Sequence, residues 1–181
     1  MHKAVVCPRC PFFAAACRSG RFKEGRENVV YLQAASTDLH ADNTGLDNAD
    51  AIGIMIYHLY HPGRHYFPGA IGGRISLAGH ARVFAAAEKF SLPHLRTLAA
   101  CYFNHCLMRE PFAAKFELWD LAKAIRIVHT STPESVRGLR DCLAMALARE
   151  DGKLLDLPEI CEAIDSVEGL ACKMLAESFK V

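Results

Sequence analysis

Apolar residues recur at helical spacing through most of the chain after residue 48, and this constrains the fold more than any other feature. In the segment that ends at Tyr60, apolar side chains recur three, four, seven and eight residues after Ile52, as on a helix with one buried face. A later helix is expected to begin around Ser91, with Pro93 in its first turn. Its apolar stripe is the clearest in the chain and consists of Leu95, Leu98, Ala99, Tyr102 and Cys106.

Further helices are predicted on both sides of these two segments. Residues 11–17 form a short apolar run, and Ser76 is a suitable N-cap for another helix. After Pro111 the sequence predicts only helices. The first of these helices has an apolar face made of Leu118, Leu121, Ala122, Ile125 and Val128. A capping box at Ser131–Glu134 predicts the start of the second, whose apolar face is Val136, Leu139, Leu143 and Ala146. Another start is expected at residues 156–159, and a closing helix over 167–179.

Residues 28–32 are the one short run typical of a buried strand. The sequence therefore predicts an α+β fold that is predominantly helical, in which a helical cluster and a small residual sheet precede an all-helical C-terminal extension. We expect two domains, over residues 1–109 and 110–181. The absence of regular strand–helix alternation argues against a doubly wound α/β sheet.

Composition excludes several classes of function. The 181 residues include 21 basic and 20 acidic side chains, without the clustered basic excess of a nucleic-acid surface. No apolar run approaches the ~20 residues of a membrane helix, and no signal peptide opens the chain. The eight cysteines are therefore expected to be reduced thiols in the nucleus or cytoplasm. We expect neither nucleic acid nor membrane as a partner.

Two clusters could carry metal or thiol chemistry. Cys7 and Cys10 form a CxxC pair, which in a structural zinc site needs a second pair of ligands that this sequence does not supply in the same pattern. His58, His61 and His65 have spacings that are possible for zinc, although solvated histidines at a helix end are the favoured explanation. A zinc- or thiol-dependent protein that uses Cys7, Cys10 and the 58–65 loop is the alternative hypothesis.

No pattern indicates an active site. His105 and Cys106 are adjacent on a helix, so their side chains diverge by about 100° and do not pair as a base and a nucleophile. We expect Cys106 to lie in the core and Trp119 to pack the C-terminal extension onto it. No catalytic residue, cofactor or metal ligand is expected, and the protein is not predicted to be an enzyme.

Four blocks of the sequence resemble, in order, the BTB/POZ domain in the form common in fungal proteins. The first is His2–Val6 with Pro11-Phe12-Phe13, and the second is the Met55–Tyr60 helix. The third runs from His80 through Ala87-Glu88-Lys89-Phe90 into Leu92-Pro93-His94-Leu95. A fourth block, over residues 124–141, resembles the helical part that follows the domain in the same proteins.

The resemblance implies a non-enzymatic protein–protein interaction module. Members of the family self-associate as homodimers and bind other proteins; some are ubiquitin-ligase adaptors on a cullin scaffold, and others join transcriptional regulators. By the same resemblance, Lys3, Val6 and Arg9 are expected to belong to a protein interface. The family's first two strands have no counterpart before His2. We therefore expect either an incomplete gene model or a protein that needs a partner strand, because residues 28–32 would otherwise have an open edge.

Overall fold

The computed structural model describes residues 1–18, 22–27, 29–32, 49–66, 75–109, 115–172 and 174. The chain divides into two compact units, one made of residues 1–75 with 83–99 and the other of residues 76–82 with 100–181. Helices α5 and α6 each contribute residues to both units, so each unit is described below by itself. The predicted domains 1–109 and 110–181 stay a prediction.

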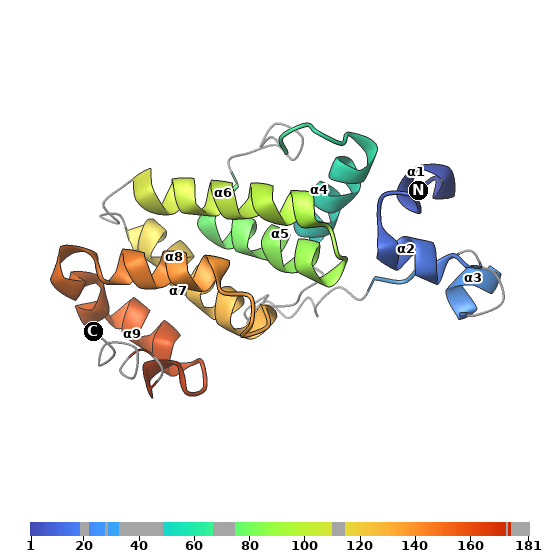
Figure 1. Ribbon diagram of the computed structural model, residues 1–181. Helices are drawn as coiled ribbons and strands as arrows, with labels where there is room; N and C mark the ends of the chain where they lie inside the picture. The colour runs from blue at the N-terminus through green and yellow to red at the C-terminus, as the bar shows by residue number, and fades with distance from the viewer. Residues whose placement is uncertain are drawn as a thin grey trace. The chain divides into compact units, whose positions relative to one another are not determined.

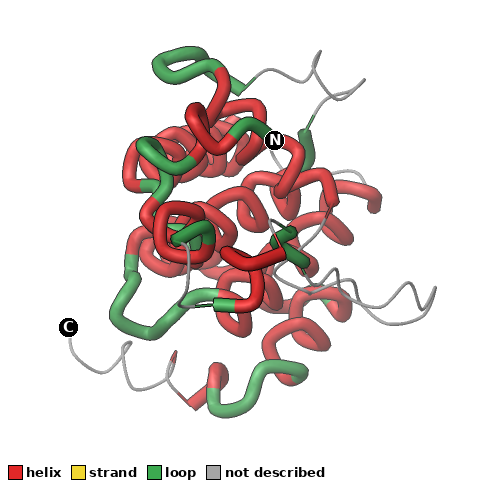
Figure 2. The backbone as a smooth tube through the Cα atoms, turned by 90° about the vertical axis from the view of Figure 1, so that its right-hand side faces the viewer, coloured by secondary structure: helices red, strands yellow, loops and turns green. Residues whose placement is uncertain are grey.

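The predicted, predominantly helical architecture is confirmed. The predicted residual sheet is not found in the part of the chain that is described. Figure 2 shows helices and loops but no strand among these residues. Residues 29–32, expected to be a buried strand, have no regular structure. Val29 is 42% exposed and Tyr31 is 81% exposed. A β-prone run forms a strand only when another strand pairs with it, and no such partner lies within the described residues.

Three short helices open the first unit: α1 (Lys3–Val6), α2 (Pro11–Ala16) and α3 (Lys23–Glu27), drawn in blue in Figure 1. The expected helix over 11–17 is thereby confirmed. Cys10 is extended and Pro11 follows at the first helical position, where its missing N–H removes no helical hydrogen bond. Helix α1 packs against α2 and α4.

Helix α4 (Ala49–Tyr60) is confirmed, but its buried face is displaced from the predicted one. The prediction placed Ile52, Ile56 and Tyr60 inside, whereas these three side chains are only half-buried. The displacement places a histidine, His58, among apolar neighbours. The buried side chains are Ala51, Ile54, Met55, His58 and Leu59.

Helix α5 (Leu77–Lys89) begins as the sequence predicts. The Ser76 hydroxyl accepts a hydrogen bond from the Gly79 N–H at 3.1 Å, which is the N-cap interaction. The next helix was expected to begin around Ser91, but Ser91 belongs to the end of α5. Ser91 has φ 55°, and the N–H groups of Ser91 and Leu92 bond back to the carbonyls of Glu88 and Ala87. This is a Schellman motif, so Ser91 terminates α5.

Helix α6 (Pro93–Arg109) has Pro93 in its first turn, as expected. Its predicted stripe is correct only at Leu95 and Ala99. Leu98, Tyr102 and Cys106 are half-buried, so the prediction that Cys106 lies in the core is wrong. The buried positions follow strict four-residue steps and are Leu95, Ala99, Phe103 and Leu107.

The second unit contains α7 (Lys115–Ser131), α8 (Gly138–Leu147), the 3₁₀ helix η2 (Arg149–Asp156) and α9 (Pro158–Asp165). Helix α7 packs against both α8 and α9. Leu121, Ala122, Ile125 and Val128 are buried as predicted, as are Leu139, Leu143 and Ala146 on α8. Pro158 opens α9 at the expected place.

The capping box predicted at Ser131–Glu134 is wrong. Helix α7 continues to Ser131, and the Thr132 hydroxyl donates a hydrogen bond to the Val128 carbonyl at 2.5 Å. Thr132 therefore closes α7 instead of opening α8, which begins only at Gly138. The Thr132 side chain is buried, and its hydrogen bond to the Val128 carbonyl satisfies the hydroxyl.

Several features that the sequence also predicts fall partly or wholly outside the described residues: a polar loop over 33–47, a turn-rich stretch over 68–73, a helix cap at residue 47 or 48, the boundary at Pro111 and part of the closing helix 167–179. Of that last helix, residues 170–172 and 174 are helical, whereas residues 167–169 form a bend and a turn, with Gly169 at φ 70°, so the helix begins later than expected. No helix in the described ranges is long and apolar enough to cross a membrane.

Candidate functional site

Exposed apolar side chains are most frequent, along the sequence, in the first 31 residues of the chain. Within the described ranges, five of the eight large apolar side chains that are exposed belong to this segment. Contiguous exposed apolar surface is typical of protein-binding sites, whereas single exposed residues need no explanation. The five are Met1 (62% exposed), Phe12 (37%), Phe22 (53%), Val29 (42%) and Tyr31 (81%).

The start of this segment is attached to its own unit by long-range hydrogen bonds and ring contacts. The Arg9 guanidinium donates to the Leu59 carbonyl at 2.6 Å, and the His2 N–H donates to the Tyr60 hydroxyl at 2.7 Å. Both acceptors lie at the end of α4. These contacts hold α1 against the end of α4.

Phe13 anchors α2 to the end of α5. Its ring is fully buried and lies nearly parallel to that of Phe90, with centroids 6.1 Å apart and planes 10° apart. The Phe12 ring packs in a T-shaped arrangement against the same Phe90 ring, with centroids 4.9 Å apart, and the Phe12 side chain is 37% exposed. One phenylalanine of the Pro-Phe-Phe sequence therefore builds the core, and its neighbour borders solvent.

The three side chains expected at a protein interface lie in different environments. Lys3 is exposed, and Val6 is only 2% exposed, so the Val6 side chain belongs to the core. Arg9 directs one guanidinium nitrogen to Leu59, as described above. That these three residues belong to an interface stays a prediction. Because Val6 is buried, it could contribute only by supporting the residues packed around it.

The CxxC pair does not form part of a metal cluster in the described chain. Cys10 is fully buried and its thiol donates to the Phe90 carbonyl at 3.5 Å, while the Cys7 thiol donates to the Phe13 carbonyl at 3.6 Å. Burial raises the pKa of the Cys7 thiol, and a hydrogen bond with Cys17 raises it further. No group of three or more His, Cys, Asp or Glu side chains in the described ranges is placed to hold a metal ion.

The structure separates the three histidines of the 58–65 segment. His58 is 7% exposed, whereas His61 and His65 are exposed. His61 lies against Tyr57, with ring centroids 4.5 Å apart. The neighbour of His58 is instead His94 of α6: its Nδ1 lies 3.4 Å from His58 Nε2. Sequence reasoning missed His94, because a pair 36 residues apart has no local spacing signal.

A cavity of about 430 Å³ lies beside this histidine pair in the first unit. Both imidazoles and the Arg9 side chain are among its polar lining groups. Burial lowers the pKa of His58, and proximity to His94 lowers it further, so the His58 imidazole is neutral at pH 7. The apolar part of the lining comes from Leu59, Pro62, Leu92, Pro93 and Leu95.

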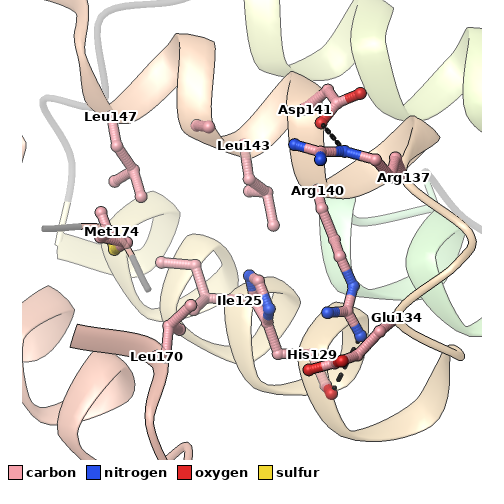
Figure 3. Close-up of a pocket in the computed structure, with 11 residues that line it drawn as sticks. Ile125, His129, Glu134, Arg137, Arg140, Asp141, Leu143, Leu147, Leu170 and Met174 are labelled. Carbon is pink, nitrogen blue, oxygen red and sulfur yellow. Dashed lines mark hydrogen bonds and ion pairs between the residues drawn. The ribbon is translucent and has the colours of Figure 1, made fainter. Parts of the chain in front are cut away.

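A second cavity, of about 220 Å³, lies within the other unit (Figure 3). Leu143, Leu147, Leu170 and Met174 form one end of it. Arg140 and Glu134 lie at the other end, where Arg140 donates to the Thr132 carbonyl at 2.8 Å and the His129 carbonyl at 3.4 Å. Arg137 is paired with Asp141 at 3.2 Å. The positive and negative side chains at the polar end therefore balance. This end of the cavity favours neither an anionic nor a cationic ligand.

Trp119 does not pack into the core as predicted. It is 56% exposed, and the Lys123 ammonium lies 5.7 Å from its ring centroid. The outward position follows from the face of α7 that Leu121 and Ile125 bury, since Trp119 falls on the opposite side of the helix. His105 is also exposed, and Cys106 beside it is half-buried.

Comparison of the chain with protein-family models, with curated proteins and with solved structures finds no match.

Proposed function

We propose that this chain is a protein–protein interaction module of BTB/POZ type that binds a second copy of itself. The observation that carries the proposal is the set of exposed apolar side chains in the first 31 residues, above all Tyr31 and Phe22. Removing such side chains from water provides most of the free energy of protein association. Tyrosine and phenylalanine are enriched in the centres of such interfaces.

The arrangement of the sequence blocks supports the same proposal. Two blocks that resemble the family are far apart in the chain, yet they meet where Phe13 packs on Phe90. The contact between Phe13 and Phe90 is a structural reason why the two blocks occur together in one chain. Residues 29–32, which have no regular structure, include Tyr31 and carry backbone N–H and C=O groups with which another chain could pair by strand addition.

Sedimentation of the full chain over a range of concentrations tests this proposal. The wild-type protein is expected to form a dimer, and the double substitution Val29→Ser with Tyr31→Ser is expected to weaken it. Loss of one central tyrosine costs about 2 kcal/mol or more, which corresponds to about a thirtyfold weaker dimer. Both side chains are exposed, so the substitutions leave the core of the monomer intact.

Trp119→Ser is the matched control, because it removes a comparably exposed aromatic side chain from the other unit. The control is expected to dimerise like the wild type. A monomer at every concentration, or equal weakening by Trp119→Ser, would contradict self-association through the N-terminal segment.

A further inference from the structure

Two thiols meet where α1 and α2 end, within the first unit. Cys7 is the C-cap residue of α1, and Cys17 is the C-cap residue of α2. Both converge on one carbonyl group: the Cys7 thiol donates to the Phe13 oxygen at 3.6 Å, and the Cys17 backbone N–H donates to the same oxygen at 2.9 Å. The Cys7 thiol also lies in hydrogen-bond contact with the Cys17 thiol. The structure therefore brings these two sulfur atoms together.

The partner of Cys7 is not the one that the CxxC spacing suggests. Cys10 is fully buried, and its thiol points to the Phe90 carbonyl at 3.5 Å. Cys7 and Cys17 are both half-buried, so a small reagent dissolved in water can reach them. Contact and access thus select Cys7 and Cys17 as the pair and set Cys10 apart.

The pair is placed to form a disulfide with little rearrangement. A disulfide joins sulfur atoms about 2.05 Å apart and has specific Cβ and Cα separations. Because the two thiols already touch and α1 packs directly on α2, the bond needs rotation of the side chains and no movement of one helix past the other. Both residues lie at helix ends, where a small adjustment of the backbone breaks no interior helical hydrogen bond.

We propose that Cys7 and Cys17 are a redox-sensitive pair that forms an intramolecular disulfide by exchange with a small-molecule disulfide such as oxidised glutathione. In the first step the Cys17 thiolate attacks one sulfur of the oxidant, whose S–S bond breaks and releases one thiolate. In the second step the Cys7 thiolate attacks the Cys17 sulfur of the mixed disulfide and releases the other. The two protons lost by the cysteines pass to the two released thiolates, so the protein loses two electrons and the oxidant gains them.

The surroundings of Cys7 set the order of these steps. Burial raises the pKa of the Cys7 thiol, and the contact with Cys17 raises it further. The thiolate is the form that attacks, so Cys7 is the poorer first nucleophile, and it resolves the mixed disulfide once Cys17 holds the oxidant beside it. The finished bond closes the chain from residue 7 to residue 17, which restricts the unfolded chain and stabilises the folded one.

The full chain, first reduced and then equilibrated with mixtures of reduced and oxidised glutathione, tests the pair. Remaining thiols are blocked with N-ethylmaleimide, and the peptides are analysed by mass spectrometry. Cleavage after Arg9 separates Cys7 from a peptide that holds both Cys10 and Cys17, and fragmentation of that peptide locates the bond. The expected product is a Cys7–Cys17 bond within one chain, with a rise in Tm of about 5 °C or more.

Cys17→Ser is expected to abolish both the bond and the oxidant-dependent rise in Tm. Cys101→Ser is the matched control, since it removes an exposed thiol from the other unit and should retain both. Four results in the wild type would overturn the proposal: no disulfide in oxidised glutathione alone, a Cys7–Cys10 bond, a glutathione adduct that persists on Cys17 while Cys7 stays free, or cross-links only between chains.

Discussion

The Asp120 carboxylate caps helix α5 from helix α7: one of its oxygens accepts a hydrogen bond from the Leu77 backbone N–H at 2.6 Å. The other oxygen accepts from the Ala78 N–H at 3.2 Å. A helix begins with N–H groups that lack partners within it and carries a partial positive charge there, so an anion at this end is doubly favourable. The Ser76 hydroxyl accepts from the Gly79 N–H, and Asp120 accepts from the two N–H groups before it.

Asp120→Ala is therefore expected to lower the free energy of unfolding by about 2 kcal/mol, within the range for charged hydrogen bonds and N-caps. Asp120→Asn should cost less, because its one carbonyl oxygen still accepts a hydrogen bond. Urea denaturation measures both values. Asp165→Ala, which removes an exposed carboxylate, should stay within about 0.5 kcal/mol of wild type. Equal loss in the Asp120 and Asp165 variants would contradict the cap.

His80 makes stability depend on pH. Burial lowers its pKa from 6.5 to about 4, and its ring lies against Tyr102 with centroids 5.5 Å apart. Between these two values the unfolded chain binds more protons than the folded one, so stability is full above pH 6.5 and decreases as the pH falls towards 4. The loss from this group is at most about 3 kcal/mol.

His80→Gln should flatten the dependence of stability on pH in that window, as measured by urea denaturation at several pH values. His58 acts in the same direction, so the difference between variant and wild type isolates the part due to His80. His105→Gln, at an exposed position, should leave the slope unchanged. An unaltered slope in His80→Gln would show that His80 is not buried in its neutral form.

Ser91 occupies the left-handed region at φ 55°, which glycine adopts without strain. The Schellman bonds that end α5 require this conformation. Ser91→Gly is expected to raise the free energy of unfolding by about 0.5–1 kcal/mol, since the relief of strain exceeds the added freedom of the unfolded chain. Ser135→Gly, at an exposed position without positive φ, should give no gain in thermal denaturation. A lower Tm for Ser91→Gly would contradict the strained cap.

The thiols should differ widely in their rates of alkylation. Cys101, Cys161 and Cys172 are exposed, whereas Cys10 is fully buried against Phe90. Cys10 should react about tenfold or more slowly than Cys101 in the native protein, because it needs a local opening to react. Mass spectrometry of partly labelled peptides measures the rates. The difference should vanish in urea, and rapid native labelling of Cys10 would contradict its burial.

Local signals predicted the helices better than they predicted the faces that those helices bury. Pro11, Pro93 and Pro158 each mark a helix start that the structure contains, because proline at the first position depends only on its own backbone. Ser91 and Thr132 were both expected to open helices, and both instead close the preceding one. The Ser91 N–H and the Thr132 hydroxyl each bond to a carbonyl three or four residues back, in the helix that they close.

The candidate sites were less predictable than the helices. The spacing of His58, His61 and His65 suggested one cluster, yet only His58 is buried and its partner is His94. Periodicity cannot reveal a pair that two helices bring together by packing. Trp119 shows the same limit, because a single aromatic residue beside an apolar stripe can lie on the buried or on the exposed face of the helix.

The sequence by itself determined that this protein is built from helices, since apolar residues at three- and four-residue spacing, prolines in first turns and the Ser76 cap act within a few residues of each other. Only the tertiary structure decided that residues 29–32 pair with no strand among the described residues, that Cys10 lies against Phe90, and that His58 faces His94. The physical reason is the separation along the sequence of the residues that each interaction joins. Helical hydrogen bonds join residues four apart, whereas strand pairing, burial and paired side chains need groups that the sequence holds far apart.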